Sequence, residues 1–229
     1  MSDLARRAIA DEQMDDPALD PAVYDAVLRD LSRINRLTLA ARPTLGFLAR
    51  SGLRQFRLLD VGFGQGDMLR TIAKWARARG VAAELVGVDL NAKSLATARA
   101  VTPSDMPIDY RVGDYRDVAG PFDFVVSSLV AHHMDARQLR GFVAWMEYKA
   151  RAGWMVNDLH RHALAYAGYP LLARAAGVHR IVREDGALSI ARSFRPAEWA
   201  AILADAGVPA GAAKVVRRFP YRLCVERLR

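Results

Sequence analysis

From about residue 56 onward, short β-rich runs alternate with longer helical patterns. The five β-rich runs before residue 160 are FRLLDVG, AELVGVDL, IDYRVGD, FDFVVSSL and GWMVNDL. Helical patterns such as DMLRTIAKWARARG and ARQLRGFVAWMEYKA separate these runs. Strands joined by helical crossovers build a parallel sheet that is covered by helices on both faces. The sequence therefore predicts an α/β fold with a doubly wound, Rossmann-like sheet.

Two more strand-like runs, AKVVRRF and YRLCVERL, close the chain and are joined around Pro220. This connection is too short for a crossover, so the two runs should be antiparallel neighbours. We therefore expect a sheet that is mostly parallel and has an antiparallel C-terminal strand.

The chain divides into a helical N-terminal segment, residues 1–55, and one domain over residues 56–229. Residues 21–50 are helical in pattern, with one apolar face made by Tyr24, Val27, Leu28, Leu31 and Ile34. This segment is either a packing element or a helical lid over a ligand site. A helical insert, at about residues 162–192, interrupts the domain.

Composition limits the class of protein. The chain has 229 residues, of which 52% are hydrophobic, enough for one large core. It contains no run of eighteen apolar residues, and its first residues, MSDLARRAIADEQMDD, lack the apolar centre of a signal peptide. We therefore expect a cytoplasmic protein with no membrane span. The single cysteine, Cys224, is expected to be a core residue.

The net charge of +8 raises the question of a nucleic-acid partner. Only Lys74, Lys93, Lys149 and Lys214 are lysines among the 33 basic residues, and the arginines are scattered without a basic tail. This distribution argues against nucleic acid. The sequence leaves the oligomeric state open.

The run LLDVGFGQGDM, residues 58–68, places glycine at every second position after a buried strand: Gly62, Gly64 and Gly66. A dinucleotide-binding loop has the spacing G-x-G-x-x-G, in which the third glycine lets the helix pack on the strand while the helix N-terminus faces a pyrophosphate. Here that position holds Asp67, whose negative charge is unfavourable beside a pyrophosphate. A phosphate-binding P-loop is excluded because no G-K-[ST] follows. The spacing favours a smaller adenosyl ligand.

Polar residues also follow the next three strands. Asp89 follows VGV at the end of the second strand, where a carboxylate can accept both hydroxyls of a ribose. Asp114 and Tyr115 follow the third strand and suit an amide-like contact to adenine and a flat surface beside it. The fourth strand, in FDFVVSSLVAHH, ends with Ser128 and is followed by two histidines.

In their order and spacing, these motifs resemble the class I S-adenosylmethionine-dependent methyltransferases of the small-molecule type, over residues 56–229. The resemblance implies S-adenosyl-L-methionine as the cofactor and a transferase function. It assigns Asp60, Gly62, Gly64 and Gly66 to the methionine end, Asp89 to the ribose, and Leu90, Asp114 and Tyr115 to the adenine. Ser128 is placed in the same site. Phe63 departs from the family, which often has a smaller residue there, and would narrow the pocket.

The acceptor would lie beyond the fourth and fifth strands. His132 and His133 follow the fourth strand, near the expected position of the methyl group, and are candidates for a general base. The alternative is a structural pair that hydrogen-bonds loop carbonyls. We expect Asn157, His160 and Arg192 to contact the acceptor, although a structural role for each is an open alternative. No metal is expected, because the histidines lack a signature such as H-E-x-x-H.

The predicted function is methyl transfer from S-adenosylmethionine to a small phenolic, polyketide-like or quinoid acceptor, at oxygen rather than carbon. The most similar family members are associated with secondary metabolism. One alternative is methylation of RNA or protein, which the charge favours and the lack of an Asn-Pro-Pro-Tyr type motif opposes. Another is a nonenzymatic S-adenosylmethionine-binding partner protein.

Overall fold

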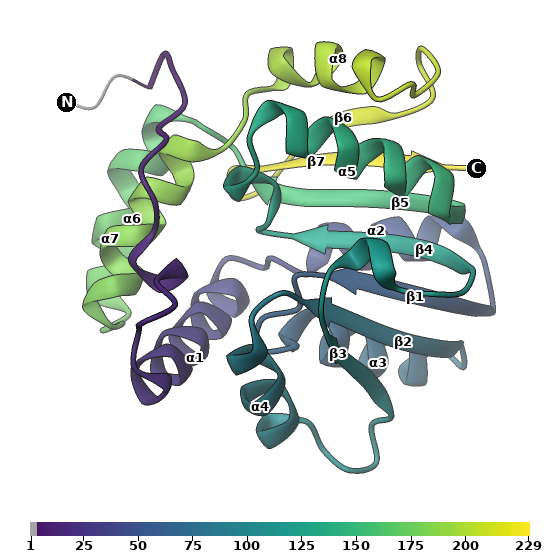
Figure 1. The fold of residues 1–229 in the computed structure, drawn as a ribbon, viewed down its shortest axis with the longest axis horizontal. Coiled ribbons are helices and arrows are strands. Elements are labelled where there is room, and N and C mark those ends of the chain that lie inside the picture. The colour runs from purple at the N-terminus through teal and green to yellow at the C-terminus, as the bar shows by residue number, and fades with distance from the viewer. Residues whose placement is uncertain (1–3) are drawn as a thin grey trace.

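The computed structural model describes residues 4–229, which form a seven-stranded sheet in the order β3-β2-β1-β4-β5-β7-β6 (Figure 1). The strands are β1 Gln55–Val61, β2 Ala82–Asp89, β3 Ile108–Val112, β4 Phe122–Ser128, β5 Ala150–Leu159, β6 Lys214–Arg218 and β7 Arg222–Leu228. The first five strands pair in parallel, whereas β7 is antiparallel to both β5 and β6. The predicted doubly wound sheet with a reversed C-terminal strand is confirmed.

Two layers of helices cover the sheet. The helices are α1 Pro21–Leu37, α2 Arg42–Ser51, α3 Asp67–Ala78, α4 Ala92–Val101, α5 Ala136–Lys149, α6 Ala163–Ala175, α7 Arg180–Arg192 and α8 Pro196–Asp205. Three single turns accompany them: η1 Gln13–Asp15, η2 Tyr115–Asp117 and η3 Ala131–His133. One hydrophobic core lies under α5 and α8, and the other lies under α2, α3 and α4.

Neighbouring strand residues enter opposite cores. In β5, Trp154 packs in the core under α5 and α8, whereas Met155 packs in the core under α2 and α3. Leu58 and Leu59 of β1 divide in the same way. Because side chains alternate along a strand, a continuous apolar run suits a strand that is buried on both faces. This explains why the β-rich runs lack an alternating polar pattern.

A third group of helices lies beyond the carboxyl ends of the parallel strands. Helices α1, α6 and α7 pack around a separate hydrophobic cluster that contains Val27, Ile34, Ala173 and Val182 (Figure 1). The helical pattern of residues 21–50 divides between two helices, because Leu39 has a φ of 53° between α1 and α2. As a result, α2 packs against the sheet, and α1 remains at its end.

The N-terminal segment runs along α7 (Figure 1). The buried carboxylate of Asp185 accepts the backbone N–H groups of Gln13 (3.1 Å) and Met14 (3.0 Å). The N–H of Ala8 donates to the carbonyl of Ala191 at 3.1 Å. These bonds hold the N-terminal segment, including η1, against α7. Among the described residues, no helix combines the length and apolarity needed to cross a membrane.

Gly153 provides a test of the packing between β5 and β7. A Cβ there would lie 2.4 Å from the backbone oxygen of Arg227 and 3.1 Å from Phe47, so Gly153→Ala should lower the free energy of unfolding by about 1 to 3 kcal/mol. Gly141, within α5, has open space around its Cβ position, so Gly141→Ala should raise it by roughly 0.5 to 1 kcal/mol. Urea denaturation measures both. Equal effects of the two substitutions would contradict this account.

Candidate active site

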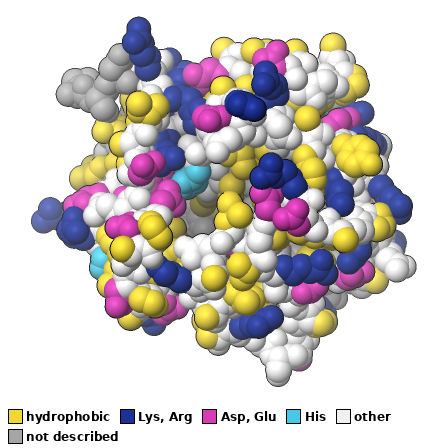
Figure 2. Space-filling model, viewed as in Figure 1, with side chains coloured by type: hydrophobic (Ala, Val, Ile, Leu, Met, Phe, Trp, Pro, Cys, Tyr) yellow, Lys and Arg dark blue, Asp and Glu magenta, His cyan; other side chains and the backbone are white. Residues whose placement is uncertain are grey.

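A cavity of about 670 Å³ opens between the carboxyl ends of β1, β2 and β4 and the helices α1, α6 and α7. Figure 2 shows a hollow on this face of the molecule, with a histidine side chain at its rim. Apolar side chains make most of the helical wall of the cavity: Leu28, Leu31, Ile34, Leu164, Tyr169, Leu172 and Ile190. The cavity therefore combines polar strand ends with an apolar wall.

The glycine loop after β1 forms the floor of the cavity. Gly62, Gly64 and Gly66 have positive φ angles of 78°, 53° and 77°, a backbone conformation that residues other than glycine rarely adopt. A Cβ at Gly62 would lie 2.3 Å from Val130, and one at Gly66 would lie 2.3 Å from the hydroxyl of Tyr110. The backbone conformation therefore favours glycine at all three positions, and close packing requires it at Gly62 and Gly66. Gly62 and Gly64 line the cavity, and Gly66 is the N-cap residue of α3.

Asp89 connects the end of β2 to this loop. Its carboxylate accepts the backbone N–H groups of Gly64 and Asn91, each at 2.9 Å. Burial raises the pKa of Asp89, and the two backbone hydrogen bonds oppose that shift. The carboxylate lines the cavity and also fixes the position of the glycine loop.

Asp60, in β1, is buried below the loop and borders a second hollow of about 820 Å³ that shares Gly62, Phe63 and Ser128 with the first. Its Oδ1 atom has no hydrogen-bond partner among the described residues. Burial, followed by the charges of Asp67 and Asp89, raises the pKa of Asp60 to about 8. Among the described residues, no cation or donor reaches this oxygen.

The two histidines of η3 differ in environment. The Nδ1 of His132 lies 2.7 Å from Asp158 Oδ1, and Asp158 Oδ2 accepts the backbone N–H of His132 at 2.9 Å. Burial lowers the pKa of His132, but the carboxylates of Asp158 and Glu12 outweigh it and raise the value to about 9. His133 is 28% exposed, and its Nδ1 lies 2.9 Å from Asp15 Oδ2. Both rings line the cavity.

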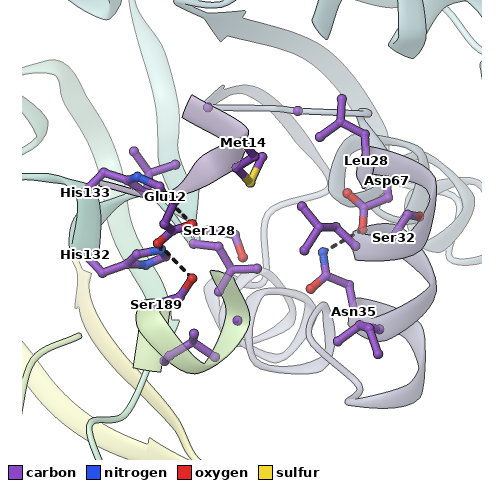
Figure 3. A pocket seen from close by; sticks show the side chains of 18 of the residues that line it. Glu12, Met14, Leu28, Ser32, Asn35, Asp67, Ser128, His132, His133 and Ser189 are labelled. Carbon is purple, nitrogen blue, oxygen red and sulfur yellow. Dashed lines mark hydrogen bonds and ion pairs between the residues drawn. The ribbon is translucent and has the colours of Figure 1, made fainter. Parts of the chain in front are cut away.

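Glu12 is a cavity residue that the sequence analysis did not identify. Its carboxylate is 3% exposed, accepts a hydrogen bond from Ser189 at 2.8 Å, and faces both histidine rings (Figure 3). Ligand atoms of Glu12, His132 and His133 lie within 4.8 Å of one another, so these side chains form a potential metal-binding group. No motif surrounds Glu12, because it reaches the site through tertiary contacts alone.

Nine of the predicted site residues line the 670 Å³ cavity: Gly62, Phe63, Gly64, Asp89, Leu90, Tyr115, Ser128, His132 and His133. Six others lie outside its lining: Asp60, Gly66, Asp114, Asn157, His160 and Arg192.

The outlying polar residues have other partners. Asp114 pairs with Arg116 at 2.5 Å. Asn157 donates to the carbonyl of Ala40 at 2.8 Å, which ties β5 to the segment before α2. His160 is buried beside the turn before β7, and its backbone N–H donates to the backbone carbonyl of Tyr221 at 2.9 Å. Arg192 is buried behind Glu12, with 3.8 Å between Nη1 and Oε1.

Comparison with known proteins identifies the family. Residues 58–153, from the glycine loop to the start of β5, match the family described as "Methyltransferase domain". Residues 58–153 therefore carry a methyltransferase domain. The predicted family, enzyme class and cofactor are thereby confirmed. No curated protein matches the chain.

Solved structures share the fold of this methyltransferase domain. A S-adenosylmethionine-dependent methyltransferase from Aquifex aeolicus has a TM-score of 0.62 and 18% identity, covering 92% of this chain and 98% of that one. Magnesium protoporphyrin IX methyltransferase from Synechocystis PCC 6803 with bound S-adenosylmethionine has a TM-score of 0.56 and 15% identity, covering 99% and 90%. A plantazolicin methyltransferase has a TM-score of 0.62 and 12% identity, covering 90% and 96%. At these identities the likeness extends to the fold alone.

Asp60 offers a test of the electrostatics in the ligand-free methyltransferase domain. An acid with a raised folded-state pKa holds its proton more tightly when folded, so stability falls as pH rises from about 4 and is fully reduced above about 8. Asp60→Asn should therefore raise the free energy of unfolding at pH 9 by on the order of a few kcal/mol, with little change at pH 4. Urea denaturation at both pH values measures this. The exposed Asp109 supplies the control, Asp109→Asn; an Asp60→Asn effect independent of pH would contradict the assignment.

Proposed function

We propose that this protein transfers the methyl group of S-adenosylmethionine to a hydroxyl oxygen of a small, largely apolar acceptor of phenolic, polyketide-like or quinoid type. The observation that carries the proposal is the single cavity that joins the glycine loop and Asp89 to an apolar helical wall and two histidines. The sulfonium of the cofactor is already an activated methyl donor. The protein must therefore mainly align the acceptor oxygen with the methyl group and exclude water.

The strand-end residues suit the cofactor. Asp89 would accept the ribose hydroxyls, and Leu90 and Tyr115 would flank the adenine, as all three line the cavity. Asp114 would bind the adenine amino group through a second acceptor position on one of its oxygens, since Arg116 already donates to both. The unpartnered Oδ1 of Asp60 is a carboxylate oxygen that the α-ammonium of the methionine end would satisfy, directly or through water.

The helical wall suits a small acceptor. Met14, Leu28, Leu164 and Tyr169 enclose the side of the cavity opposite the sheet and would bury a flat apolar molecule. The described neighbours include methyltransferases whose names specify magnesium protoporphyrin IX and plantazolicin, both of them small relative to a macromolecule. Figure 2 shows Lys and Arg interspersed with Asp and Glu on this face, without the continuous basic track that RNA requires.

His132 and His133 are proposed to contact the acceptor oxygen. Both lie on η3, directly after β4, on the polar side of the same cavity. The buried Asp158 orients the ring of His132 through Nδ1 and leaves Nε2 directed toward the cavity. His133 is the more open of the two rings. In this arrangement the pair would position the hydroxyl and stabilise negative charge on its oxygen.

The first test of this function is cofactor binding. Calorimetric titration should detect S-adenosylmethionine and no NAD, because the glycine spacing does not suit a pyrophosphate. Asp89→Ala should weaken binding by roughly 1.5 to 3 kcal/mol through loss of charge-assisted hydrogen bonds, and Asp109→Ala should leave it unchanged. Asp89→Asn removes the charge and keeps an acceptor oxygen for only one of the backbone N–H groups of Gly64 and Asn91, so thermal unfolding of each variant accompanies the titration. Binding of NAD without binding of S-adenosylmethionine would overturn the proposed function.

The second test is methyl transfer. Purified protein with labelled S-adenosylmethionine should methylate members of a panel of phenols and hydroxyquinones, detected by mass, and should leave RNA and peptides unlabelled. His133→Ala should lower the rate by about 100-fold to 10,000-fold with nearly unchanged cofactor affinity. The matched control, His179→Asn, keeps the cap of α7 and should retain the rate. Labelled RNA or peptide with no labelled small molecule would overturn the acceptor class.

A further inference from the structure

Three side chains from distant parts of the chain converge at the polar end of the cavity. Glu12 comes from the N-terminal segment, and His132 and His133 come from η3 after β4. The Nε2 of His132 lies 3.5 Å from Glu12 Oε1, and the Nε2 of His133 lies 3.9 Å from Glu12 Oε2. Figure 3 shows the carboxylate between the two rings.

These separations are too long for strong hydrogen bonds, which join N and O at about 2.7 to 3.2 Å. They suit ligands that share one ion. Donor atoms at about 2.0 to 2.2 Å from a tetrahedral Zn²⁺ lie roughly 3.4 Å from one another. The spread of up to 4.8 Å in the group requires only a small rotation of these side chains to close around an ion.

One carboxylate on the Nδ1 side of each ring fixes the orientation of that ring. Asp158 binds Nδ1 of His132 at 2.7 Å, and Asp15 binds Nδ1 of His133 at 2.9 Å. Each ring thus directs Nε2 toward Glu12. A histidine that ligates a metal through one nitrogen almost always donates its other N–H to a carboxylate, a carbonyl or a water. Two neighbouring rings with this same arrangement fit the surroundings of a metal centre.

The charges around the rings also favour a cation. The side chains that contact the two rings or Glu12 include three carboxylates, Glu12, Asp15 and Asp158, and one guanidinium, Arg192. With neutral rings their formal charge is −2, which a divalent cation would balance. Arg192 lies behind the carboxylate, at 3.8 Å from Oε1, and leaves Oε2 for a ligand bond.

We propose that Glu12, His132 and His133 form a binding site for one divalent transition-metal ion of the Zn²⁺ class. Two imidazoles and one carboxylate suit Zn²⁺, Co²⁺ or Fe²⁺, whereas Mg²⁺ prefers oxygen ligands alone. Three protein ligands leave at least one coordination position open, and here it would face the cavity.

The role of such an ion rests on the proposed methyl transfer, whereas its binding does not. A hydroxyl acceptor that occupies the open position would release its proton to water at lower pH, because the ion acts as a Lewis acid. An oxygen lone pair would then form the O–CH₃ bond as the S–CH₃ bond breaks, with that electron pair remaining on sulfur. The two histidines would therefore contact the acceptor oxygen through the ion.

The experiment is a titration of the full chain, purified without a histidine tag and stripped with a chelator. Calorimetry should give one equivalent of bound Zn²⁺ and none of Mg²⁺ at the same concentration, and Co²⁺ should develop the absorption bands of a nitrogen- and oxygen-ligated site. Glu12→Gln should weaken Zn²⁺ binding by more than about 100-fold, and Asp158→Asn by about 10-fold to 100-fold.

Two controls match these variants. His179→Asn changes a histidine outside the cluster, and Glu184→Gln changes an exposed glutamate, so both should keep the single equivalent. Circular dichroism and thermal unfolding verify that each variant is folded. Failure of the folded wild-type chain to bind one equivalent, or equal affinity in Glu12→Gln, would overturn the site.

S-adenosylmethionine binding, measured on the same stripped protein, separates the two proposals. Cofactor binding without Zn²⁺ binding overturns the metal site and leaves the proposed function. Zn²⁺ binding lost in Glu12→Gln but without cofactor binding overturns the proposed function and supports the metal site.

Discussion

The parallel pairing of the first five strands is the constraint on which the site depends. In a parallel sheet all carboxyl ends lie at one edge, so the loops after β1, β2 and β4 meet there although they are far apart in sequence. The cores on the two faces fix these strands, and the loops carry the polar groups. The helices α1, α6 and α7 then close the edge into a cavity.

Buried carboxylates organise that edge. Asp89 holds the glycine loop, Asp158 holds η3, and Asp185 holds the N-terminal segment, each by accepting backbone N–H groups. Charged groups in such positions are stable because several donors surround them. Asp60 differs, since one oxygen lacks a partner among the described residues and its pKa is raised. A protein can accept such a cost where a ligand supplies the missing contact.

The strand-end residues were predictable because motif order fixes strand order, and strand order fixes which loops meet. Asp89 and His132 therefore appeared at the cavity as expected. Glu12 did not, since no local pattern marks it and its position depends on contacts with Ser189 and α7, almost the whole chain away. Asn157 also lies near the end of a strand, yet its amide donates to the carbonyl of Ala40. The alternation of side chains along a strand could not reveal that partner.

The docking of the N-terminal segment on α7 has a practical consequence. Residues 4–20 contain no strand and only the single turn η1, so they are natural targets for trimming or for an affinity tag. Their removal would take away Glu12 and Asp15 together, along with the backbone N–H groups that donate to Asp185. Such a shortened protein would present an altered cavity, and assays on it would describe an altered site.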